Sequence, residues 1–241
     1  MNKIKKIEVG YTNESYKQDN IFFQIKKKNG LNHKSDYKQL KNFDFVPKLI
    51  EDNDEYSKWE WIDGKHLDIN PSKNDLEQLA QILLKLHNSN VKFTKSNIRK
   101  RIETYRKIIK QKNIKIEIIE KLYRKINVIL KNIDKTKPIH GDLYKVNMIK
   151  TKENKIYLVD WEYSHMGDIH FELAYIIEAF NLDSEKEKIF LEAYNNYDSY
   201  ILKKHKILVN YITILWLYSQ DKLFFSPEHC IKRLENLAEK N

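Results

Sequence analysis

The sequence contains few of the residues that interrupt regular structure or cross-link a chain. Its 241 residues include five glycines, four prolines and a single cysteine, Cys230. So few turn-forming residues favour long regular elements without a flexible linker. One cysteine excludes an intramolecular disulfide framework, which fits a protein of the reducing cytoplasm.

Long hydrophobic runs are also missing. The N-terminal residues 1–6 are charged and no apolar core follows them, so they lack the pattern of a secretory signal. The longest apolar stretch lies near residues 211–218 and is shorter than the roughly 20 residues that cross a bilayer. We therefore expect a cytoplasmic chain that does not insert into membranes.

Positive charge is in excess, with 44 lysines and arginines against 34 acidic residues and a formal net charge of +10. Such an excess is typical of proteins that bind nucleic acid or acidic membrane surfaces. Here the lysines are scattered over nearly every segment and form no single stripe, as on an ordinary solvated surface. We expect no nucleic-acid partner. Steeply salt-dependent retention on a polyanion would support the alternative, a nucleic-acid-binding protein.

One window departs from this distribution, because no lysine or arginine occurs between Lys155 and Lys186. The window carries Asp160, Glu162, Asp168, Glu172, Glu178, Asp183 and Glu185. In so basic a chain, an acidic window indicates a place where cations bind. The alternative is a chance gap on a buried strand and helix.

The pattern of the chain changes near residue 62. The first sixty residues predict short strands, among them 4–9 and 21–26, and a short helix over 36–43. The rest predicts helices at 75–87, 97–110, 116–133 and 171–180, further helices to the end, and one hairpin of strands 146–149 and 156–160. We expect an α+β fold with a small strand-rich N-terminal lobe, residues 1–62, and a larger mainly helical C-terminal lobe, residues 63–241.

The expected hairpin adjoins a motif that carries chemistry. The segment H-G-D-L-Y-K-V-N starts at His140, and the strand behind it ends at Asp160. Phosphoryl transfer passes through a loose, metaphosphate-like state, so the enzyme mainly positions groups and neutralises charge. In this pattern Asp142 would face the attacking hydroxyl, while Asn147 and Asp160 would supply the oxygen ligands that Mg²⁺ prefers.

Each residue of the motif also has a structural interpretation. Alone, Asp142 or Asn147 would be a turn residue, Asp160 the end of a strand, and His140 a brace for the loop. The combined spacing favours an ATP- and Mg²⁺-dependent small-molecule kinase.

The motif resembles the aminoglycoside phosphotransferase and choline kinase superfamily, a branch of the protein-kinase-like fold. The resemblance covers nearly the whole chain and is strongest from 139 to 174, where L-V-D-W-E-Y-S at 158–164 and M-G-D at 166–168 look like bacterial choline kinases. It implies two lobes with ATP between them and a small alcohol as the phosphoryl acceptor.

The resemblance also implies a nucleotide site. The segment G-Y-T-N is similar to the short nucleotide loop, so Thr12 and Asn13 would cover the phosphates. Glu60, Trp61 and Ile62 are similar to the connector whose backbone binds adenine.

Some positions depart from the family. No G-x-G-x-x-G loop is present. Lys26 is the expected basic residue at the phosphates, with Gln24 as the alternative in another register, and Asp36 stands where the acidic partner is usually glutamate. A kinase-like module that binds nucleotide without transferring phosphate would fit these departures; ADP release on adding an amino alcohol would exclude it.

The acceptor pocket is likewise implied by the resemblance. Tyr163, Glu178 and Trp216 match or lie near residues that relatives place around a quaternary ammonium, and Glu162 lies beside them. A ring face contributes roughly 0.5–2 kcal/mol to binding such a cation. Thr213 occupies the second tryptophan position, and Trp216 could also be a core aromatic. We expect a small cationic alcohol, choline first, with ethanolamine, thiamine and aminoglycosides as alternatives.

Overall fold

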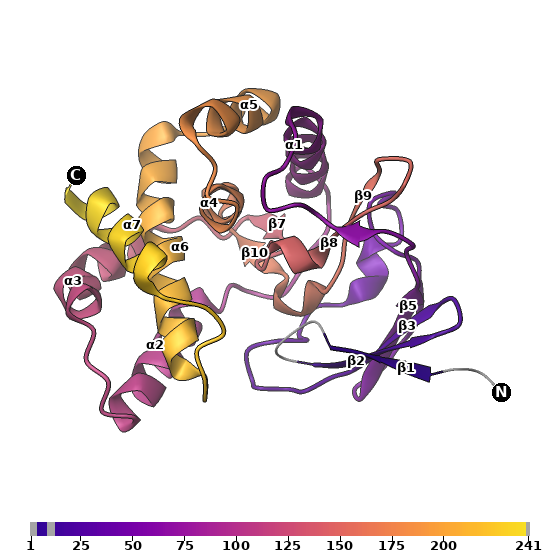
Figure 1. The fold of residues 1–241 in the computed structure, drawn as a ribbon, viewed down its shortest axis with the longest axis horizontal. Coiled ribbons are helices and arrows are strands. Elements are labelled where there is room, and N and C mark those ends of the chain that lie inside the picture. Colours follow the sequence, from indigo (N-terminus) through magenta and orange to yellow (C-terminus); the bar gives the residue numbers. More distant parts are fainter. Residues whose placement is uncertain (1–3, 9–12, 240–241) are drawn as a thin grey trace.

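A computed structural model describes residues 4–8 and 13–239, and it places an antiparallel sheet beside a larger group of helices (Figure 1). The sheet has the strand order β1-β2-β3-β5-β4. Its strands are β1 (Ile4–Ile7), β2 (Glu14–Gln18), β3 (Ile21–Ile25), β4 (Leu49–Asp52) and β5 (Tyr56–Glu60). The sequence did not predict β2, because its polar residues E-S-Y-K-Q lack the alternation of a half-buried strand.

The register of this sheet creates a short row of polar side chains on one face. Ser15 on β2 lies opposite Gln24 on β3, and Gln24 lies opposite Ser57 on β5. All three side chains are buried. Polar side chains at paired positions of three neighbouring strands place hydrogen-bonding groups on this face of the sheet.

Helices form most of the remaining chain. They are α1 (Lys73–His87), α2 (Ile98–Gln111), α3 (Glu117–Asn132), α4 (Ile169–Ala179), α5 (Ser184–Tyr194), α6 (Ser199–Ser219) and α7 (Glu228–Glu239). The helix α4 lies at the centre of this part and packs on α6 (Figure 1). It is apolar on nearly all sides, as a helix surrounded by protein should be. None of the helices in the described part of the chain is long and apolar enough to cross a membrane.

Two small sheets hold the segment that carries the chemical motif. Strand β7 (Lys137–Ile139) pairs with β10 (His165–Gly167), and β6 (Lys65–His66) pairs with β8 (Met148–Lys150), which pairs with β9 (Ile156–Leu158). The loop between β7 and β8 is therefore anchored at both ends. Two expected elements differ: residues 145–147 form a 3-10 turn before β8, and the short helix near residue 36 is a 3-10 turn, Tyr37–Leu40.

Candidate active site

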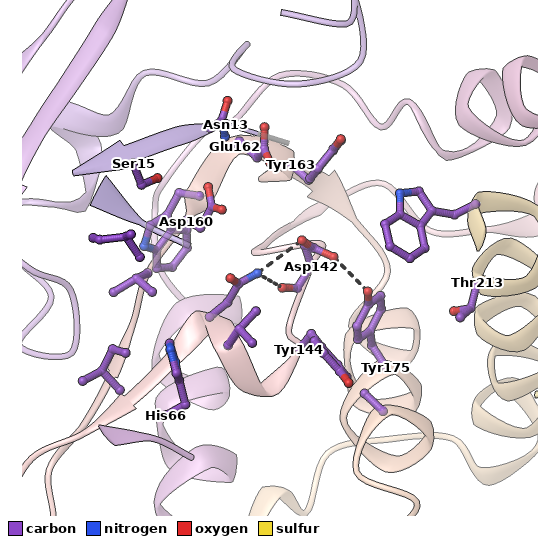
Figure 2. A pocket seen from close by; sticks show the side chains of 18 of the residues that line it. Asn13, Ser15, His66, Asp142, Tyr144, Asp160, Glu162, Tyr163, Tyr175 and Thr213 are labelled. Carbon is purple, nitrogen blue, oxygen red and sulfur yellow. Dashed lines mark hydrogen bonds between the residues drawn. The ribbon is translucent and has the colours of Figure 1, made fainter. Parts of the chain in front are cut away.

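A cavity of about 740 Å³ opens between the five-stranded sheet and the helices, and residues from both parts line it. Most of the residues singled out in the sequence lie on its wall: Asn13, Glu60, Trp61, Ile62, Asp142, Asn147, Asp160, Glu162, Tyr163, Glu178 and Trp216. Figure 2 shows part of this wall, with Asp142 near its centre. Thr12 lies outside the described residues.

The backbone before Asp142 is bent at a position that requires glycine. Gly141 has φ of +79°, and a Cβ there would come within 2.6 Å of the carbonyl oxygen of Tyr163. The N–H of Gly141 donates to Oε1 of Glu172 on α4, at 2.8 Å. Because Glu172 also bonds to His87 of α1 at 2.9 Å, two helices hold the loop in place.

Two donors orient the carboxylate of Asp142. The hydroxyl of Tyr175 donates to Oδ1 at 2.8 Å, and Nδ2 of Asn147 lies 3.2 Å from Oδ2 (Figure 2). The same Nδ2 donates to the carbonyl oxygen of Asp142 at 2.8 Å. Asn147 therefore uses its amide nitrogen within the loop, and among the described residues no donor reaches its Oδ1.

Asp160 follows β9 in a conformation that is uncommon for a residue other than glycine, with φ of 63°. The N–H of the preceding Val159 donates to the carbonyl of Asn147 at 2.9 Å, so the hairpin and the loop are held together. The side chain of Gln24 donates to Oδ1 of Asp160 at 3.3 Å. Such backbone strain persists where the surrounding structure enforces it, and functional sites are common places for it.

Three carboxylates create a local demand for positive charge. Burial raises the pKa of Asp160 well above its ordinary range, and the charges of Glu162 and Asp142 raise it further, while the hydrogen bond from Gln24 opposes this shift. Like charges disfavour each other's ionised form, and a cation among them would reverse that effect. This part of the cavity therefore favours a positive charge.

His140 braces the loop. Its ring centroid lies 4.5 Å from that of Trp161, and its Nε2 donates to the carbonyl of Val159 at 3.0 Å. Burial lowers its pKa, so the imidazole stays neutral near pH 7. These contacts match the structural role that the motif suggested for it.

Lys26 is not at the cavity. Its ammonium lies 2.6 Å from Oδ1 of Asp52 and donates to the carbonyl of Asn53, so this lysine forms an ion pair at the edge of the sheet. Gln24, the alternative in the other register, lines the cavity and contacts Asp160. Asp36 caps the 3-10 turn by accepting the N–H of Lys38, so Lys26 and Asp36 do not form the expected pair.

The connector presents few backbone donors to the cavity. The N–H of Glu60 donates to the carbonyl of Lys48 at 2.8 Å, and that of Trp61 donates to the carbonyl of Asn20 at 2.8 Å. Both amides are thus committed to neighbouring strands and loops. Ile62 is the remaining connector position at which a backbone N–H could bind a base.

At the opposite end of the cavity, the carboxylate of Glu178 is paired with a positively charged side chain. Arg233 of α7 forms two hydrogen bonds with it, Nε to Oε2 at 2.8 Å and Nη2 to Oε1 at 3.0 Å. The amide of Asn210 donates to Oε2 as well, at 2.8 Å. A carboxylate paired in this way offers little net negative charge to an ammonium group, so Glu178 is less suited to contact that group than the resemblance implied.

Aromatic rings surround the same end. Trp216 stacks against Phe224 and Phe225, with ring centroids 5.7 and 6.5 Å away. The guanidinium of Arg101 lies 4.5 Å from the ring centroid of Tyr163. Two kinds of contact thus hold the aromatic wall: ring stacking on one side and a cation on the other.

Two residues of the cavity wall, and one that pairs with a wall residue, were not found from the sequence. Tyr175 lies in an apolar helix, where nothing distinguishes it from a core aromatic. Arg101 lies in a basic amphipathic helix among other lysines and arginines, and Arg233 lies in the last helix, far along the chain from its partner Glu178. Their roles depend on which helices pack together.

Comparisons with known proteins identify relatives over nearly the whole chain. The profile described as "Phosphotransferase enzyme family" matches residues 37–206. "Protein LicA homolog" of Mycoplasma capricolum subsp. capricolum is 46% identical over 237 residues, covering 98% of each chain.

Solved structures share the fold. Choline kinase LicA from Streptococcus pneumoniae has a TM-score of 0.75 at 20% identity, covering 98% of this chain and 92% of that one. A choline/ethanolamine kinase family protein from Mesorhizobium loti has a TM-score of 0.77 at 16% identity, covering 99% and 88%. The expected α+β, two-lobed protein-kinase-like fold is confirmed.

Proposed function

Because this chain belongs to the phosphotransferase enzyme family, we propose that it transfers the γ-phosphoryl group of ATP to the hydroxyl of a small cationic alcohol, with choline as the first candidate. Residues 1–62 would form the nucleotide-binding lobe and residues 63–241 the lobe that carries the catalytic loop and the acceptor. The convergence of Asp142, Asn147 and Asp160 on one part of the cavity wall carries this proposal.

Asp142 would act on the acceptor. Tyr175 and Asn147 hold its carboxylate in one orientation, so a hydroxyl donating to it would point its oxygen toward the γ-phosphorus. As the new P–O bond forms and the bond to the β-phosphate oxygen breaks, the hydroxyl proton would pass to Asp142. In a loose transition state this transfer comes late, and positioning accounts for most of the effect.

Asn147 and Asp160 would hold Mg²⁺. The amide nitrogen of Asn147 is used within the loop, which leaves Oδ1 as a ligand, and Asp160 is a buried carboxylate beside two others. No group of three His, Cys, Asp or Glu side chains placed to hold a metal occurs in residues 4–8 and 13–239. Two protein oxygens suit Mg²⁺, because this ion usually takes its remaining ligands from water and from substrate phosphates. The ion would neutralise negative charge on the transferred group.

The nucleotide would lie against the sheet. Adenine would contact the connector at Glu60, Trp61 and Ile62, with the Ile62 amide as donor, and Asn13 would lie near the phosphates. Gln24, in place of a lysine, would contribute a neutral donor at this point. Phosphate charge would then be offset mainly by the metal ion.

The acceptor would occupy the aromatic end of the cavity, among Glu162, Tyr163 and Trp216. The acidic side chains near Asp142 favour a cationic alcohol, and the structural neighbours include enzymes named as choline kinases. The single cysteine and the need for ATP favour the cytoplasm as the compartment.

The test is a coupled assay of ADP release with Mg·ATP and choline, ethanolamine, thiamine or an aminoglycoside as acceptor. We expect release with choline that stops when EDTA removes Mg²⁺ and reappears when Mg²⁺ is added back. Transfer only to ethanolamine, thiamine or an aminoglycoside would support the proposed reaction with a substrate other than choline. No transfer to any alcohol, with intact nucleotide binding, would contradict the proposal.

A further inference from the structure

A buried arginine at the acceptor end of the cavity has no role in the mechanism above. Arg101, on α2, lines the cavity and is only 5% exposed. Its Nε and Nη1 are fully buried and find no hydrogen-bond acceptor among the described residues. Guanidinium groups stay protonated in proteins, so this is a buried positive charge with few polar partners.

The surroundings of Arg101 offset that charge only in part. The ring of Tyr163 covers it at 4.5 Å, and the nearby charged and phenolic groups are those of Tyr105, Tyr163, Asp142 and Tyr175. None of them forms an ion pair with it. A buried charge without a partner carries a large desolvation penalty, which an anion bound beside it would relieve.

The place of Arg101 limits which anion this can be. Arg101 and Asp142 line the same cavity, and the negative charge of Asp142 acts on the guanidinium. Asp142 is also where the acceptor hydroxyl would lie. Whatever the alcohol, the transferred phosphoryl group ends on that hydroxyl, where it brings up to two negative charges close to a carboxylate. A fixed guanidinium at this point opposes the resulting repulsion and matches the geometry of a phosphate group.

We propose that Arg101 binds the phosphate of the newly formed phosphate monoester, and that it distinguishes the product from the unphosphorylated alcohol. This inference rests on the proposed function for its ligand. A substrate carboxylate is the competing ligand, and it would have to lie next to the hydroxyl.

The experiment compares two ligands that differ only in the phosphate. Calorimetry measures the binding of choline and of phosphocholine to the wild-type protein and to Arg101→Met, which keeps the length of the side chain and removes its charge. We expect Arg101→Met to weaken phosphocholine by roughly 10-fold or more, the loss of one charge-assisted contact, and to leave choline unchanged or bound more tightly. Arg99→Met is the matched control, since Arg99 lies on the same helix, is exposed and bonds to Asn127.

Several results would overturn the inference. Equal losses for both ligands, or no loss for either, would show that Arg101 is structural. A loss confined to a hydroxy acid such as serine would assign it to a substrate carboxylate. Arg101→Gln, which keeps a polar group in the buried position, replaces the methionine variant if that variant does not fold. If the proposed function is wrong, the wild-type protein will release no ADP with any alcohol. If only this inference is wrong, the wild-type protein will turn over and Arg101→Met will not change the affinity for phosphocholine.

Discussion

Asp142→Asn separates a catalytic carboxylate from one that only stabilises the loop. The substitution keeps the shape of the side chain and removes its charge and its ability to accept a proton. One oxygen remains to accept either from Tyr175, now 2.8 Å from Oδ1, or from Asn147, now 3.2 Å from Oδ2. The loop should therefore keep its fold, because the bond from Asn147 to the carbonyl of residue 142 does not involve the side chain that changes.

The magnitude follows from what is lost. A positioned general base contributes about 10²–10⁴-fold to a rate, which corresponds to about 3–5 kcal/mol in the barrier. Tyr175→Phe is the matched control, since it removes one donor to the same carboxylate and leaves the charge in place. A single hydrogen bond contributes about 1 kcal/mol, so we expect this variant to lose about 10-fold or less in kcat.

Steady-state kinetics with Mg·ATP and choline, together with calorimetry of Mg·ATP, measure both effects. We expect Asp142→Asn to lower kcat by the larger factor with little change in nucleotide affinity. Turnover within about threefold of the wild type would refute the role of Asp142 as the base. Equal losses for Asp142→Asn and Tyr175→Phe would show that orientation of the loop, and not proton acceptance, is what the carboxylate supplies.

Three further predictions concern the metal site, pH and the loop. Asp160→Ala should abolish the dependence of ATP affinity on Mg²⁺, measured by calorimetry with Mg²⁺ and with EDTA, because it removes the proposed charged ligand of the ion. Burial lowers the pKa of His165 from 6.5 to about 4, so between these pH values its imidazole stays neutral in the folded protein and takes up a proton in the unfolded chain. The free energy of unfolding should therefore fall by about 3 kcal/mol between pH 6.5 and 4 through this residue. In a denaturant titration, His165→Asn should remove that part of the fall. Gly141→Ala should destabilise the protein by about 1–3 kcal/mol and lower its Tm, since the added Cβ meets the Tyr163 carbonyl at a left-handed φ.

Each of these has a result that would count against it. Unchanged Mg·ATP affinity in Asp160→Ala would show that Asp160 does not bind the metal ion. A pH dependence of stability that is the same in His165→Asn as in the wild type, with the exposed His229→Asn as control, would mean that His165 titrates equally in both states. A Gly141→Ala protein with wild-type Tm would show that the loop can shift away from Tyr163.

Local pattern predicted most of the helices because it is a property of neighbouring residues. Apolar residues at helical spacing located α1 to within two residues of its start, and the capping box of Ser72 and Asp75 explains why it begins there. The polar strand β2 was missed because its place in the sheet depends on pairing with β1 and β3, which its own residues do not indicate.

The nucleotide side shows the same division. The alternation of β3 left two candidates for the phosphates, Gln24 and Lys26, because residues two apart share a face of a strand. Two features distinguish these residues: the strand ends at Ile25, and Lys26 forms an ion pair with Asp52, which lies on another strand. Strand ends and cross-strand ion pairs are decided by tertiary pairing.

The amino-acid sequence by itself determined the α+β class, the helical half and the motif whose three oxygen-bearing residues line the cavity. These depend on spacings of a few residues, along a loop and a hairpin that can close in few ways. Only the tertiary structure decided that Arg233 neutralises Glu178 from 55 residues away and that Arg101 lies buried against Tyr163. The net charge of a pocket is a sum over side chains brought in by separate helices, so the packing of α2, α4 and α7 sets it.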